Sequence, residues 1–313
     1  MALSLAVRLE FDETKAGKVA IVVTEAATNL LKHGGGGEIV LSVIADGGDE
    51  VGLAVLALDK GPGIKNLGES LRDGNSTTGT SGNGLGAIAR LSDAFDIFSQ
   101  PGKGTALVAQ FWKRPPSSPN RFAVGGFSVA TEGEQACGDG WSHRQTPTGI
   151  SVFLSDGLGH GPLAEDASRA GLQVFHKYGH LPPAELLEQV HRATRSTRGA
   201  AVAIASIDLE VNLVRFCGIG NIVGALVADG QTRHMVSMAG IIGHEARAFR
   251  EFTYPWQKNA LMVMHSDGLG TRWDLSAYPG LAHKACDLIA GVLYRDLVRR
   301  RDDATCVVVR QAE

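Results

Sequence analysis

The sequence has few cysteines, and it contains no C-x-x-C pair. Its four cysteines are far apart along the chain, at Cys137, Cys217, Cys286 and Cys306. This spacing argues against a zinc site and against a disulfide framework. The scarcity of cysteine therefore favours a reducing compartment, and we expect a cytoplasmic protein.

Long apolar runs and a strong excess of charge are absent as well. No run of about 18 apolar residues occurs, and the first eleven residues lack the basic and apolar regions of a signal peptide. We therefore expect neither secretion nor a membrane span. With 30 basic and 33 acidic residues the formal net charge is -3, which gives no global attraction to nucleic acid or anionic lipid. Any phosphate-binding site must be local.

Glycine, in contrast, is abundant, with 40 glycines among 313 residues. Many lie in short polar or acidic loops, a placement that indicates backbone-lined binding sites. The length suits two domains of roughly 150 residues each. The stretch Lys113–Asn120 carries three prolines and no apolar residue, which is typical of a linker. We predict a first domain over 1–112, a linker over 113–120 and a second domain over 121–313.

The first half shows the pattern of one α/β layer pair. A broad apolar surface over Glu13–His33, stopped by four glycines, predicts one long helix. Two β-rich runs, Glu38–Ala45 and Glu50–Leu58, flank a D-G-G-D turn and predict a hairpin. A helix from about Leu85 to Asp93 and a second hairpin through Pro101–Gly104 are expected to follow.

The second half alternates in the same way between strand and helix patterns. Two helices are expected between Gly161 and Ser196, and another from about Leu281 to Arg299. Strands are expected near Arg121–Ala130, Gly149–Leu154, Ala200–Asp208, Val211–Cys217, Leu261–His265 and Ala304–Arg310.

Two groups of residues in the first half are candidates for binding a nucleotide. Glu25 and Asn29 are four apart on the predicted first helix and share one face, although a solvent-facing polar stripe explains them equally well. Asp59 ends a strand and is followed by Gly61 and Gly63. There a carboxylate could accept from a purine amino group while backbone approaches closely. Alone, such a D-x-G-x-G pattern is often only a turn.

Two further elements complete this pattern. The run G-N-G-L-G, which contains Gly84 and Gly86, opens a helix and supplies free backbone N–H groups and a positive dipole end for phosphates. Thr105 enters the last strand after a glycine, where a simple hairpin turn is the alternative. Each element is weak evidence by itself, but isolated turns do not account for all four in this order.

Together these motifs resemble the nucleotide site of the ATPase superfamily that includes histidine kinases, gyrase and the anti-sigma serine kinases. The resemblance spans residues 13–112, and E-A-A-T-N-L-L-K-H-G is especially similar to the anti-sigma and switch-kinase branch. It implies that the domain binds ATP with Mg²⁺, that Asn29 holds the Mg²⁺ and that Glu25 is the catalytic base. It further implies that Asp59 binds adenine beside Thr105, that Gly61 and Gly63 line the base, and that Gly84 and Gly86 line the phosphates.

Four aspartates of the second half stand next to glycine or at predicted strand ends. They are Asp139 in C-G-D-G-W, Asp156 in S-D-G-L-G-H-G, Asp267 in H-S-D-G-L and Asp302 in R-D-D-A-T. Each one alone is most simply a turn residue. Three of them adjoin a predicted buried strand, however, so their carboxylates could converge at one sheet edge. Oxygen-only ligands of this kind suit hard divalent cations.

The set resembles the metal-dependent protein phosphatases of the 2C class, in particular the bacterial branch of the stage II sporulation phosphatase. S-D-G-L-G-H-G, G-I-G-N, H-S-D-G-L and D-D-A-T-C-V-V-V-R occur in the order of that family over residues 121–310. The resemblance implies two Mn²⁺ or Mg²⁺ ions and in-line attack of water on a phosphoserine or phosphothreonine. It implies that Asp156 and Asp267 are catalytic and that the metal ligands are Asp139, Asp156, the Gly157 carbonyl, Asp267 and Asp302, with Asp303 the weaker member of its pair.

One residue and one motif near these aspartates are also considered. His160 could protonate the leaving alkoxide, or it could be a turn residue that caps the following helix. The run Gly218–Asn221 is interpreted as a tight turn beside the site. The chain also lacks the basic phosphate clamp of some eukaryotic relatives, so the resemblance implies that the substrate phosphate rests mainly on the metals.

The predicted fold class is α/β. We expect an N-terminal two-layer α/β sandwich of the histidine-kinase-like ATPase type and a C-terminal four-layer α/β/β/α sandwich of the metal-dependent phosphatase type. The resemblances imply a bifunctional partner-switching regulator. Its phosphatase would act on a phosphorylated antagonist of the sulfate-transporter-and-antisigma-antagonist (STAS) type or another anti-sigma antagonist, and its ATP-binding half would phosphorylate the same class of partner.

Two other functions remain open at this point. The N-terminal half could be a non-catalytic, ATP-gated module that binds a partner and regulates the phosphatase. The C-terminal half could be a silent scaffold, which is disfavoured because none of the four acidic positions is substituted. ATP could also order the loop Ser70–Asn83 and change the surface presented to a partner. No nucleic-acid or membrane partner is expected, and a homodimer is left open.

Overall fold

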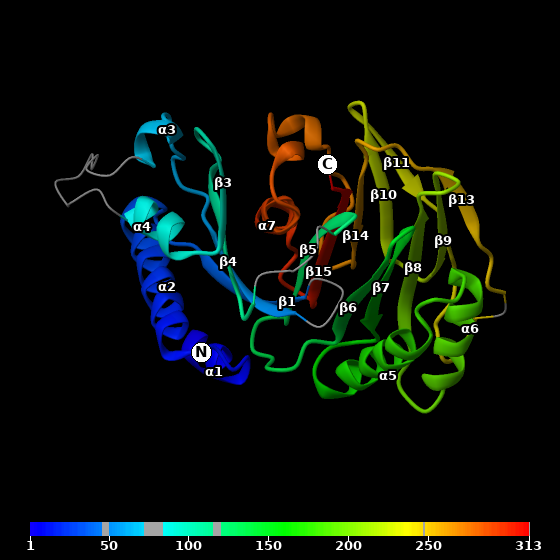
Figure 1. Ribbon diagram of the computed structural model, residues 1–313. Coiled ribbons are helices and arrows are strands. Elements are labelled where there is room, and N and C mark those ends of the chain that lie inside the picture. The colour runs from blue at the N-terminus through cyan, green and yellow to red at the C-terminus, as the bar shows by residue number, and fades with distance from the viewer. Residues whose placement is uncertain (46–49, 72–83, 115–119, 247, 313) are drawn as a thin grey trace. The chain divides into compact units, whose positions relative to one another are not determined.

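The computed structural model describes residues 1–45, 50–71, 84–114, 120–246 and 248–312, and in it the chain forms two compact units (Figure 1). The first unit comprises residues 1–119 and 278–295, and the second comprises residues 120–277 and 296–313. Each unit combines helices with mainly antiparallel sheet, the exception being the parallel pair β12 and β9 in the second unit. The predicted α/β class is confirmed.

The first unit is built on a four-stranded antiparallel sheet with the strand order β1-β2-β4-β3. The long helix and the first strand have the predicted bounds, and the side chain of Asp12 caps the helix by accepting from the Lys15 amide at 2.7 Å. The elements are α1 (Ala2–Arg8), α2 (Glu13–His33), β1 (Glu38–Ala45), β2 (Val51–Leu58), α3 (Leu67–Ser70), α4 (Gly84–Leu91), β3 (Ala94–Gln100) and β4 (Gly104–Trp112).

Apolar side chains of α2 form the core on one face of this sheet. Val22 and Ala26 are fully buried and pack in one cluster with Leu53 and Val55 of β2. Fully burying an aliphatic side chain of this kind contributes about 1.5–3 kcal/mol. The amphipathic pattern of α2 therefore fixes which face of the helix meets the sheet. Helix α1, which the sequence did not predict, is seven residues long, too short for its periodicity to be read.

A later segment of the chain completes the first unit. It contains the 3₁₀ turn η2 (Leu281–His283) and most of α7 (Cys286–Leu297). The sequence predicted a single helix over this region. The backbone at Lys284 is extended instead, with φ −83° and ψ 169°, so the turn and the helix are separate elements.

The second unit contains two sheets and two helices that cover one of them. The five-stranded sheet has the order β11-β10-β14-β15-β5, and the six-stranded sheet includes the path β12-β9-β8-β7-β6 with β13 beside β9. The elements are β5 (Phe122–Val129), β6 (Asp139–Thr146), β7 (Gly149–Gly157), α5 (Pro162–Tyr178), α6 (Pro183–Ala193), β8 (Ala200–Asp208), β9 (Leu213–Ile219), β10 (Val223–Ala228), β11 (Gln231–Met235), β12 (Ser237–Met238), β13 (Phe252–Pro255), β14 (Leu261–His265), η1 (Leu275–Ala277) and β15 (Ala304–Gln311).

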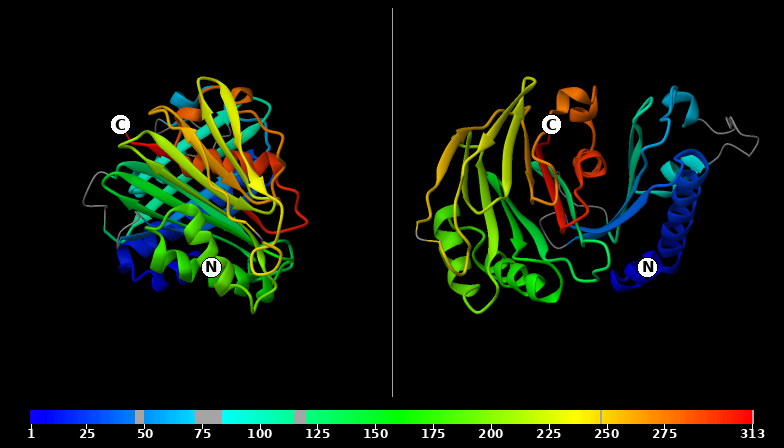
Figure 2. Two further views of the ribbon diagram at one scale, coloured as in Figure 1. Left: turned by 90° about the vertical axis from the view of Figure 1, so that its right-hand side faces the viewer. Right: turned by 180° about the vertical axis from the view of Figure 1, so that it is seen from behind.

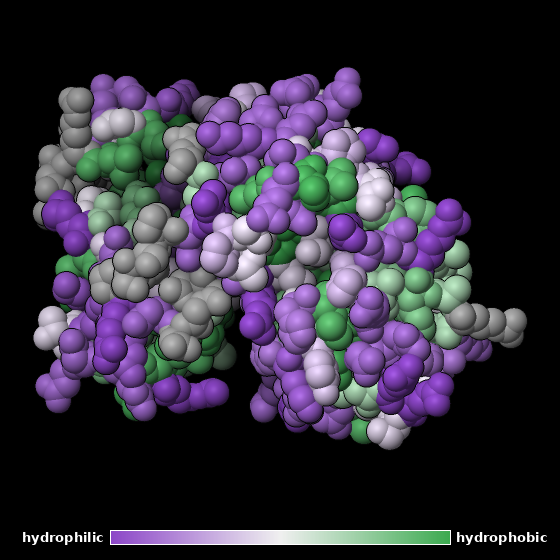
Figure 3. Space-filling view, turned by 45° about the vertical axis from the view of Figure 1, so that its right-hand side comes forward, coloured by the Kyte–Doolittle hydropathy of each residue, from purple (hydrophilic) through white to green (hydrophobic). Residues whose placement is uncertain are grey.

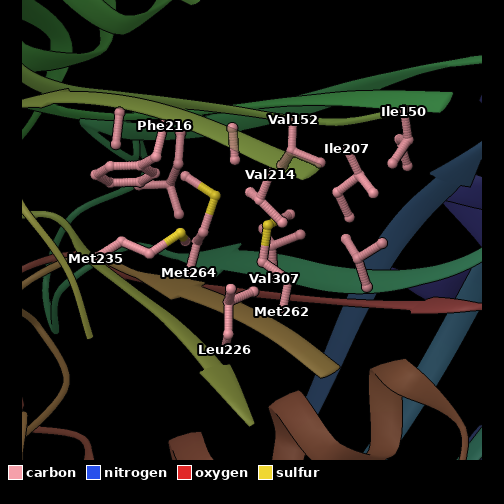
Figure 4. Close-up of a cluster of buried hydrophobic side chains, with 14 of the residues drawn as sticks. Ile150, Val152, Ile207, Val214, Phe216, Leu226, Met235, Met262, Met264 and Val307 are labelled. Carbon is pink, nitrogen blue, oxygen red and sulfur yellow. The ribbon is translucent and has the colours of Figure 1, made fainter. Parts of the chain in front are cut away.

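Alternation along β7 separates two apolar cores. Val152 faces the core between the two sheets, together with Phe216 and Met264 (Figure 4). Phe153 points the other way and packs with Phe175 of α5. Because strand side chains alternate with a period of two, a single buried strand can serve both cores. Helices α5 and α6 therefore lie on the outer face of the six-stranded sheet (Figure 2).

Several short or polar strands were not predicted. Strand β6 reads D-G-W-S-H-R-Q-T, and its later residues are partly exposed because it forms an edge of its sheet. Strands β10 to β13 are at most six residues long. The four cysteines are free thiols. Among the described residues, no helix combines the length and apolarity that crossing a bilayer would take. Hydrophilic side chains predominate on the face shown in Figure 3.

Candidate functional sites

Two of the predicted metal ligands are direct cross-strand neighbours. Strands β6 and β7 pair antiparallel in a register that sets Asp139 opposite Asp156. Asp139 begins β6 and Asp156 stands next to the last residue of β7. Like charges directly opposite each other destabilise a sheet. Such a pair is therefore expected only where something compensates the repulsion.

The other two predicted ligands belong to the five-stranded sheet. Asp267 follows β14 and Asp302 precedes β15, and these strands pair antiparallel, with His265 opposite Cys306. The Ser266 hydroxyl donates to Oδ2 of Asp139 at 2.7 Å and accepts from the Thr305 amide at 2.9 Å. This serine therefore links the carboxylate edges of the two sheets.

The electrostatics of this edge are those of an uncompensated carboxylate cluster. Burial, together with the negative charges of Asp139, Asp267 and Asp302, raises the pKa of Asp156 to about 9. Burial raises the pKa of Asp139 to about 7, against the lowering effect of hydrogen bonds from Ser266 and Thr305. Burial and the charge of Asp302 also raise the pKa of Asp267.

A hydrated divalent cation fits this arrangement. Oδ1 of Asp139 is buried and has no hydrogen-bond partner within the described residues, and a cation there would satisfy it. In the same part of the chain, no three Asp, Glu, His or Cys side chains converge closely enough to hold one ion alone. An ion at this edge would therefore keep water ligands, as Mg²⁺ commonly does with one or two carboxylates.

The adjacent aspartates at the start of β15 have different environments. Asp303 is buried, and its two carboxylate oxygens accept from the Thr131 amide at 2.7 Å and the Gly138 amide at 2.5 Å. Asp302 is partly exposed and accepts from the Asp303 amide at 2.9 Å. Asp303 thus organises the loop that leads to Asp139, while Asp302 keeps an oxygen for another ligand.

The polar residues around the cluster hold its members in place. Asn221 donates from Nδ2 to Oδ2 of Asp267 at 2.7 Å, so the G-I-G-N motif does more than form the turn, in which Gly220 has φ +100°. The motif was the only signal of this contact. Ser266 was likewise visible only as the residue before Asp267.

Two basic residues flank the glycine loop after Asp156. Nδ1 of His160 lies 2.7 Å from Oε1 of Glu134. The capping alternative for His160 is not seen, because Gly161 is the N-cap of α5 and makes no side-chain cap. The guanidinium of Arg198 lies against Gly159, 3.2 Å from where a Cβ on that glycine would be. Sequence reasoning missed Arg198, which no motif singled out.

In the first unit, α2 brings Glu25 and Asn29 to the start of α4. A Cβ built on Gly84 would lie 3.2 Å from Oε2 of Glu25 and 3.4 Å from Oδ1 of Asn29. Nδ2 of Asn29 is buried and lacks a hydrogen-bond partner in the part of the chain that is described. Gly86, two residues further on, is buried in α4. Gly82, Asn83 and most of the loop Ser70–Asn83 lie outside the described residues.

The Asp59 group forms a second cluster at the end of α2. Oδ1 of Asp59 accepts from the amides of Gly61 at 2.8 Å and Thr105 at 3.1 Å. The Thr105 hydroxyl lies 2.9 Å from that of Ser99. A Cβ built on Gly34, which caps α2, would lie 2.7 Å from Cβ of Asp59. Helix α2 therefore joins the Asp59 group to the Glu25 and Asn29 group.

Gly63 belongs to the same loop and is conformationally required. It has φ +69°, and a Cβ there would overlap the Gln100 carbonyl oxygen. Only glycine allows this close approach of backbone to backbone. The loop therefore makes a tight turn at the strand end.

Comparison with known proteins decides the family. The sequence profile of the stage II sporulation protein E (SpoIIE) family matches residues 146–311, more than half of the chain. The chain belongs to the SpoIIE family. In this SpoIIE-family chain a second profile, that of the histidine kinase-like ATPase domain, matches residues 1–111. The predicted combination of an ATPase domain with a SpoIIE-type phosphatase domain is confirmed.

Individual relatives match the two halves separately. The phosphoserine phosphatase RsbX of Bacillus subtilis (strain 168) is 23% identical over 183 residues, which cover 58% of this chain and 91% of RsbX. The serine/threonine-protein kinase RsbT of the same organism is 35% identical over 111 residues, which cover 36% of this chain and 83% of RsbT.

A solved structure extends the likeness to the fold. The crystal structure of RsbX in complex with magnesium superposes with a TM-score of 0.54 at 21% identity, covering 63% of this SpoIIE-family chain and 98% of that chain. At this identity the likeness shows a shared fold.

Proposed function

We propose that this SpoIIE-family chain is a partner-switching regulator with two opposed activities. Residues 121–313 dephosphorylate phosphoserine or phosphothreonine on a STAS-type antagonist protein. Residues 1–112 bind ATP with Mg²⁺ and phosphorylate the same class of partner. The resemblance of both halves to partner-switching enzymes motivates the choice of partner, and the likeness to RsbX, a phosphoserine phosphatase, supports the reaction.

One observation carries the phosphatase half of this proposal: the carboxylate cluster at the joint edge of the two sheets. Within the described residues, one buried oxygen of Asp139 has no hydrogen-bond partner. The raised pKa values of Asp139 and Asp156 show that their negative charges are not balanced, and bound cations would balance them. We assign Asp139, Asp156, the Gly157 carbonyl, Asp267 and Asp302 to two Mn²⁺ or Mg²⁺ ions. When bound, two such ions polarise the phosphate and lower the pKa of water, so that hydroxide is available near neutral pH.

The chain's own residues then have distinct tasks. Ser266 and Asn221 orient the carboxylates of Asp139 and Asp267 through the hydrogen bonds at 2.7 Å. Glu134 faces Nδ1 of His160, so a protonated imidazole can offer its Nε2 proton to the departing serine or threonine oxygen. No protein nucleophile is required for this reaction.

Substitution of single carboxylates tests the phosphatase assignment. Asp156→Asn and Asp267→Asn should each lower kcat for Mn²⁺-dependent hydrolysis of a phosphoserine peptide by at least about a hundredfold, because a misheld ion forfeits several kcal/mol of transition-state stabilisation. Asp166→Asn is the matched control, since Asp166 is exposed on α5 and forms its ion pair with the exposed Arg169 one turn away. Full activity in Asp156→Asn would rule out the assignment.

The kinase half of the proposal rests on a different observation. Glu25 and the Asn29 amide, which has no partner within the described residues, meet the start of α4, whose backbone N–H groups suit phosphates. We assign Asn29 to Mg²⁺, Glu25 to the base, Asp59 with Thr105 to adenine, Gly61 and Gly63 to the sides of the base, and Gly84 and Gly86 to the phosphates. The likeness to the kinase RsbT supports this set.

The test is transfer of label from γ-labelled ATP to a STAS-domain protein encoded beside this chain. Wild type should label it, and Glu25→Gln should not. Glu13→Gln, on the exposed first turn of the same helix, is the control that should label normally.

A non-catalytic, ATP-gated binding module is the alternative for this half. It predicts that wild type transfers no label, that ATP changes affinity for the partner, and that Glu25→Gln leaves this ATP-dependent binding intact. Pull-down of the partner with and without ATP, run beside the labelling assay, separates the two functions.

A further inference from the structure

The first unit contains a segment that its own domain profile does not include. The ATPase profile ends at residue 111, whereas the SpoIIE profile covers 146–311 and so includes α7. By spatial contact, however, residues 278–295 belong to the first unit. Part of the phosphatase sequence therefore forms part of the ATP-binding unit.

This segment covers the face of the first sheet that α2 leaves bare. Leu53 and Val55 of β2 face α2. The alternate residues Leu56 and Leu58 point to the opposite face, and they are only 0% and 2% exposed. A Cβ built on Gly291 of α7 would lie 2.7 Å from Cδ2 of Leu56 and 3.2 Å from that of Leu58. Helix α7 thus lies directly on this apolar face.

Polar contacts tie the segment to three of the four strands. Asp287 accepts from the Gln110 amide of β4 at 2.5 Å, and the Tyr294 hydroxyl donates to Glu38 of β1 at 2.7 Å. Asp96 of β3 accepts from the Lys284 ammonium and the Ala285 amide, both at 2.8 Å. Contacts distributed over the sheet in this way fix both the position and the rotation of the helix.

A further contact reaches the end of β2, at the candidate nucleotide site. The guanidinium of Arg295, which is 5% exposed, donates to the backbone carbonyl oxygen of Asp59 at 3.3 Å. The side chain of the same aspartate organises the loop of Gly61 and the Thr105 amide. A nucleotide that engages Asp59 therefore acts on a residue that Arg295 holds by its backbone.

After Arg295 the chain enters the second unit, where residues 297–299 pair with the loop that follows Asp267. Leu297 accepts from the Gly270 amide, and the Arg299 amide donates to Gly268, each at 2.9 Å. Val298 forms a bridge with Leu269 between these two bonds. At 1.5 Å of rise per helical residue, Leu297 stands about 3 Å along the helix from Arg295. The chain itself thus connects the Arg295 contact with Asp59 in the first unit to the backbone hydrogen bonds of the loop after Asp267 in the second.

We propose that Arg295 and α7 couple the nucleotide site to the phosphatase metal site. The proposal rests on the proposed function, because it needs a nucleotide at Asp59 and a divalent cation at Asp267. Nucleotide binding orders Asp59, Arg295 transmits this to the last turn of α7, and the Gly268–Gly270 backbone is held more firmly. The ordering cost of cation binding falls, so the nucleotide tightens cation binding. By linkage the cation tightens nucleotide binding by the same factor.

The experiment uses the full chain and two readouts. Hydrogen exchange of the peptide covering 266–270 is followed with and without AMP-PNP, a non-hydrolysable ATP analogue, at fixed free Mg²⁺. The free Mn²⁺ concentration at half-maximal hydrolysis of p-nitrophenyl phosphate is measured in metal-buffered solution under the same two conditions. Wild type should show slower exchange in 266–270 and a midpoint lowered by about fivefold or more, the lower end of typical couplings.

Variants of two neighbouring residues isolate the path. Arg295→Met and the charge-retaining Arg295→Lys should still bind a fluorescent ATP analogue but bring the coupling factor close to one. Tyr294→Phe, which removes the tie to Glu38 on β1 and leaves Arg295 in place, should keep it. Arg295→Lys serves if Arg295→Met fails to fold.

The outcomes separate this inference from the function on which it rests. If the fluorescent nucleotide binds and neither readout responds in wild type, the coupling is wrong while the ATP site stands. If Arg295→Lys couples as wild type does, the route through Arg295 is wrong. If no nucleotide binds at all, both the assigned ATP site and the proposed coupling are wrong.

Discussion

The two pairs of carboxylates at the sheet edge are held in place by neighbouring residues. Ser266 connects Asp139 to the start of β15, and Asn221 holds Asp267. Both carboxylate oxygens of Asp303 accept hydrogen bonds from backbone amides. Because these contacts are buried or short, small displacements of the backbone should change the spacing of the cluster more than changes at exposed positions would.

Gly268 is the position at which this sensitivity is most easily tested. A Cβ there would overlap the carbonyl oxygen of Asp303, so Gly268→Ala must shift either the Asp267 loop or the start of β15. We expect kcat for phosphoserine-peptide hydrolysis to fall by about tenfold or more, since displacements near 1 Å can cost about a hundredfold. Circular dichroism should show an unchanged fold.

Gly270→Ala provides the control two residues away. The nearest atom to its added Cβ would be the Leu297 carbonyl oxygen at 3.6 Å, an ordinary contact. It should retain near-normal activity. Equal loss in both variants would show that any side chain in the loop is harmful and that the Asp303 overlap is not the cause.

At the scale of elements, α7 is the least expected part of the molecule. Nearly all of its residues, Cys286 to Arg295, are buried. A helix that is apolar around most of its circumference must be covered on several sides. Its contacts with the first sheet use glycine, which allows the helix to approach Leu56 and Leu58 closely.

Filling this contact should loosen the first unit. Gly291→Val places extra carbon atoms against Leu56 and Leu58, and overpacking of this kind costs about 1–3 kcal/mol. The free energy of unfolding from urea titration should fall by that amount. Gly17→Ala on α2, where nothing lies within 4 Å of the added Cβ, should be neutral or stabilising. An unchanged midpoint in Gly291→Val would argue against close packing of α7 on the sheet.

At the scale of the whole molecule, the carboxylate cluster makes stability depend on pH and on cations together. In the folded chain the carboxyls of Asp139 and Asp156 have pKa values raised to about 7 and about 9, from a reference of 3.8. The folded state therefore keeps protons that the unfolded state loses. The contribution of these two carboxyls to stability is therefore greatest at low pH and is lost as the pH rises toward their folded-state pKa values.

We expect the free energy of unfolding in a metal chelator to fall by on the order of 1–3 kcal/mol between about pH 5 and about pH 8. Saturating Mn²⁺ should remove much of this fall, because the ion takes the place of the protons and binds only the folded chain. Urea titrations at several pH values, with chelator or with Mn²⁺, provide the measurement. Asp139→Asn should flatten the chelator curve. A free energy of unfolding that stays level or rises with pH in chelator would contradict the raised pKa values of Asp139 and Asp156.

Local patterns were enough to predict the main elements and the candidate residues. The bounds of α2 follow from its apolar periodicity and its glycine stop, and β1, β8 and β14 have the predicted bounds. The aspartates were found because each stands beside glycine or at a strand end. The polar edge strand β6 was missed, since its partly exposed, polar residues carry little of the alternation that marks a strand.

The sequence by itself determined the α/β class, the long helix of the first half, the motif residues and the resemblance to two enzyme families, because all of these depend on local spacing. Only the tertiary structure decided that Asp139 lies opposite Asp156, that Ser266 joins the two sheets at this edge and that α7 packs on Leu56 and Leu58. These are contacts between residues far apart in the chain. Their partners are selected by register and by the burial of whole faces, which no local window of sequence contains.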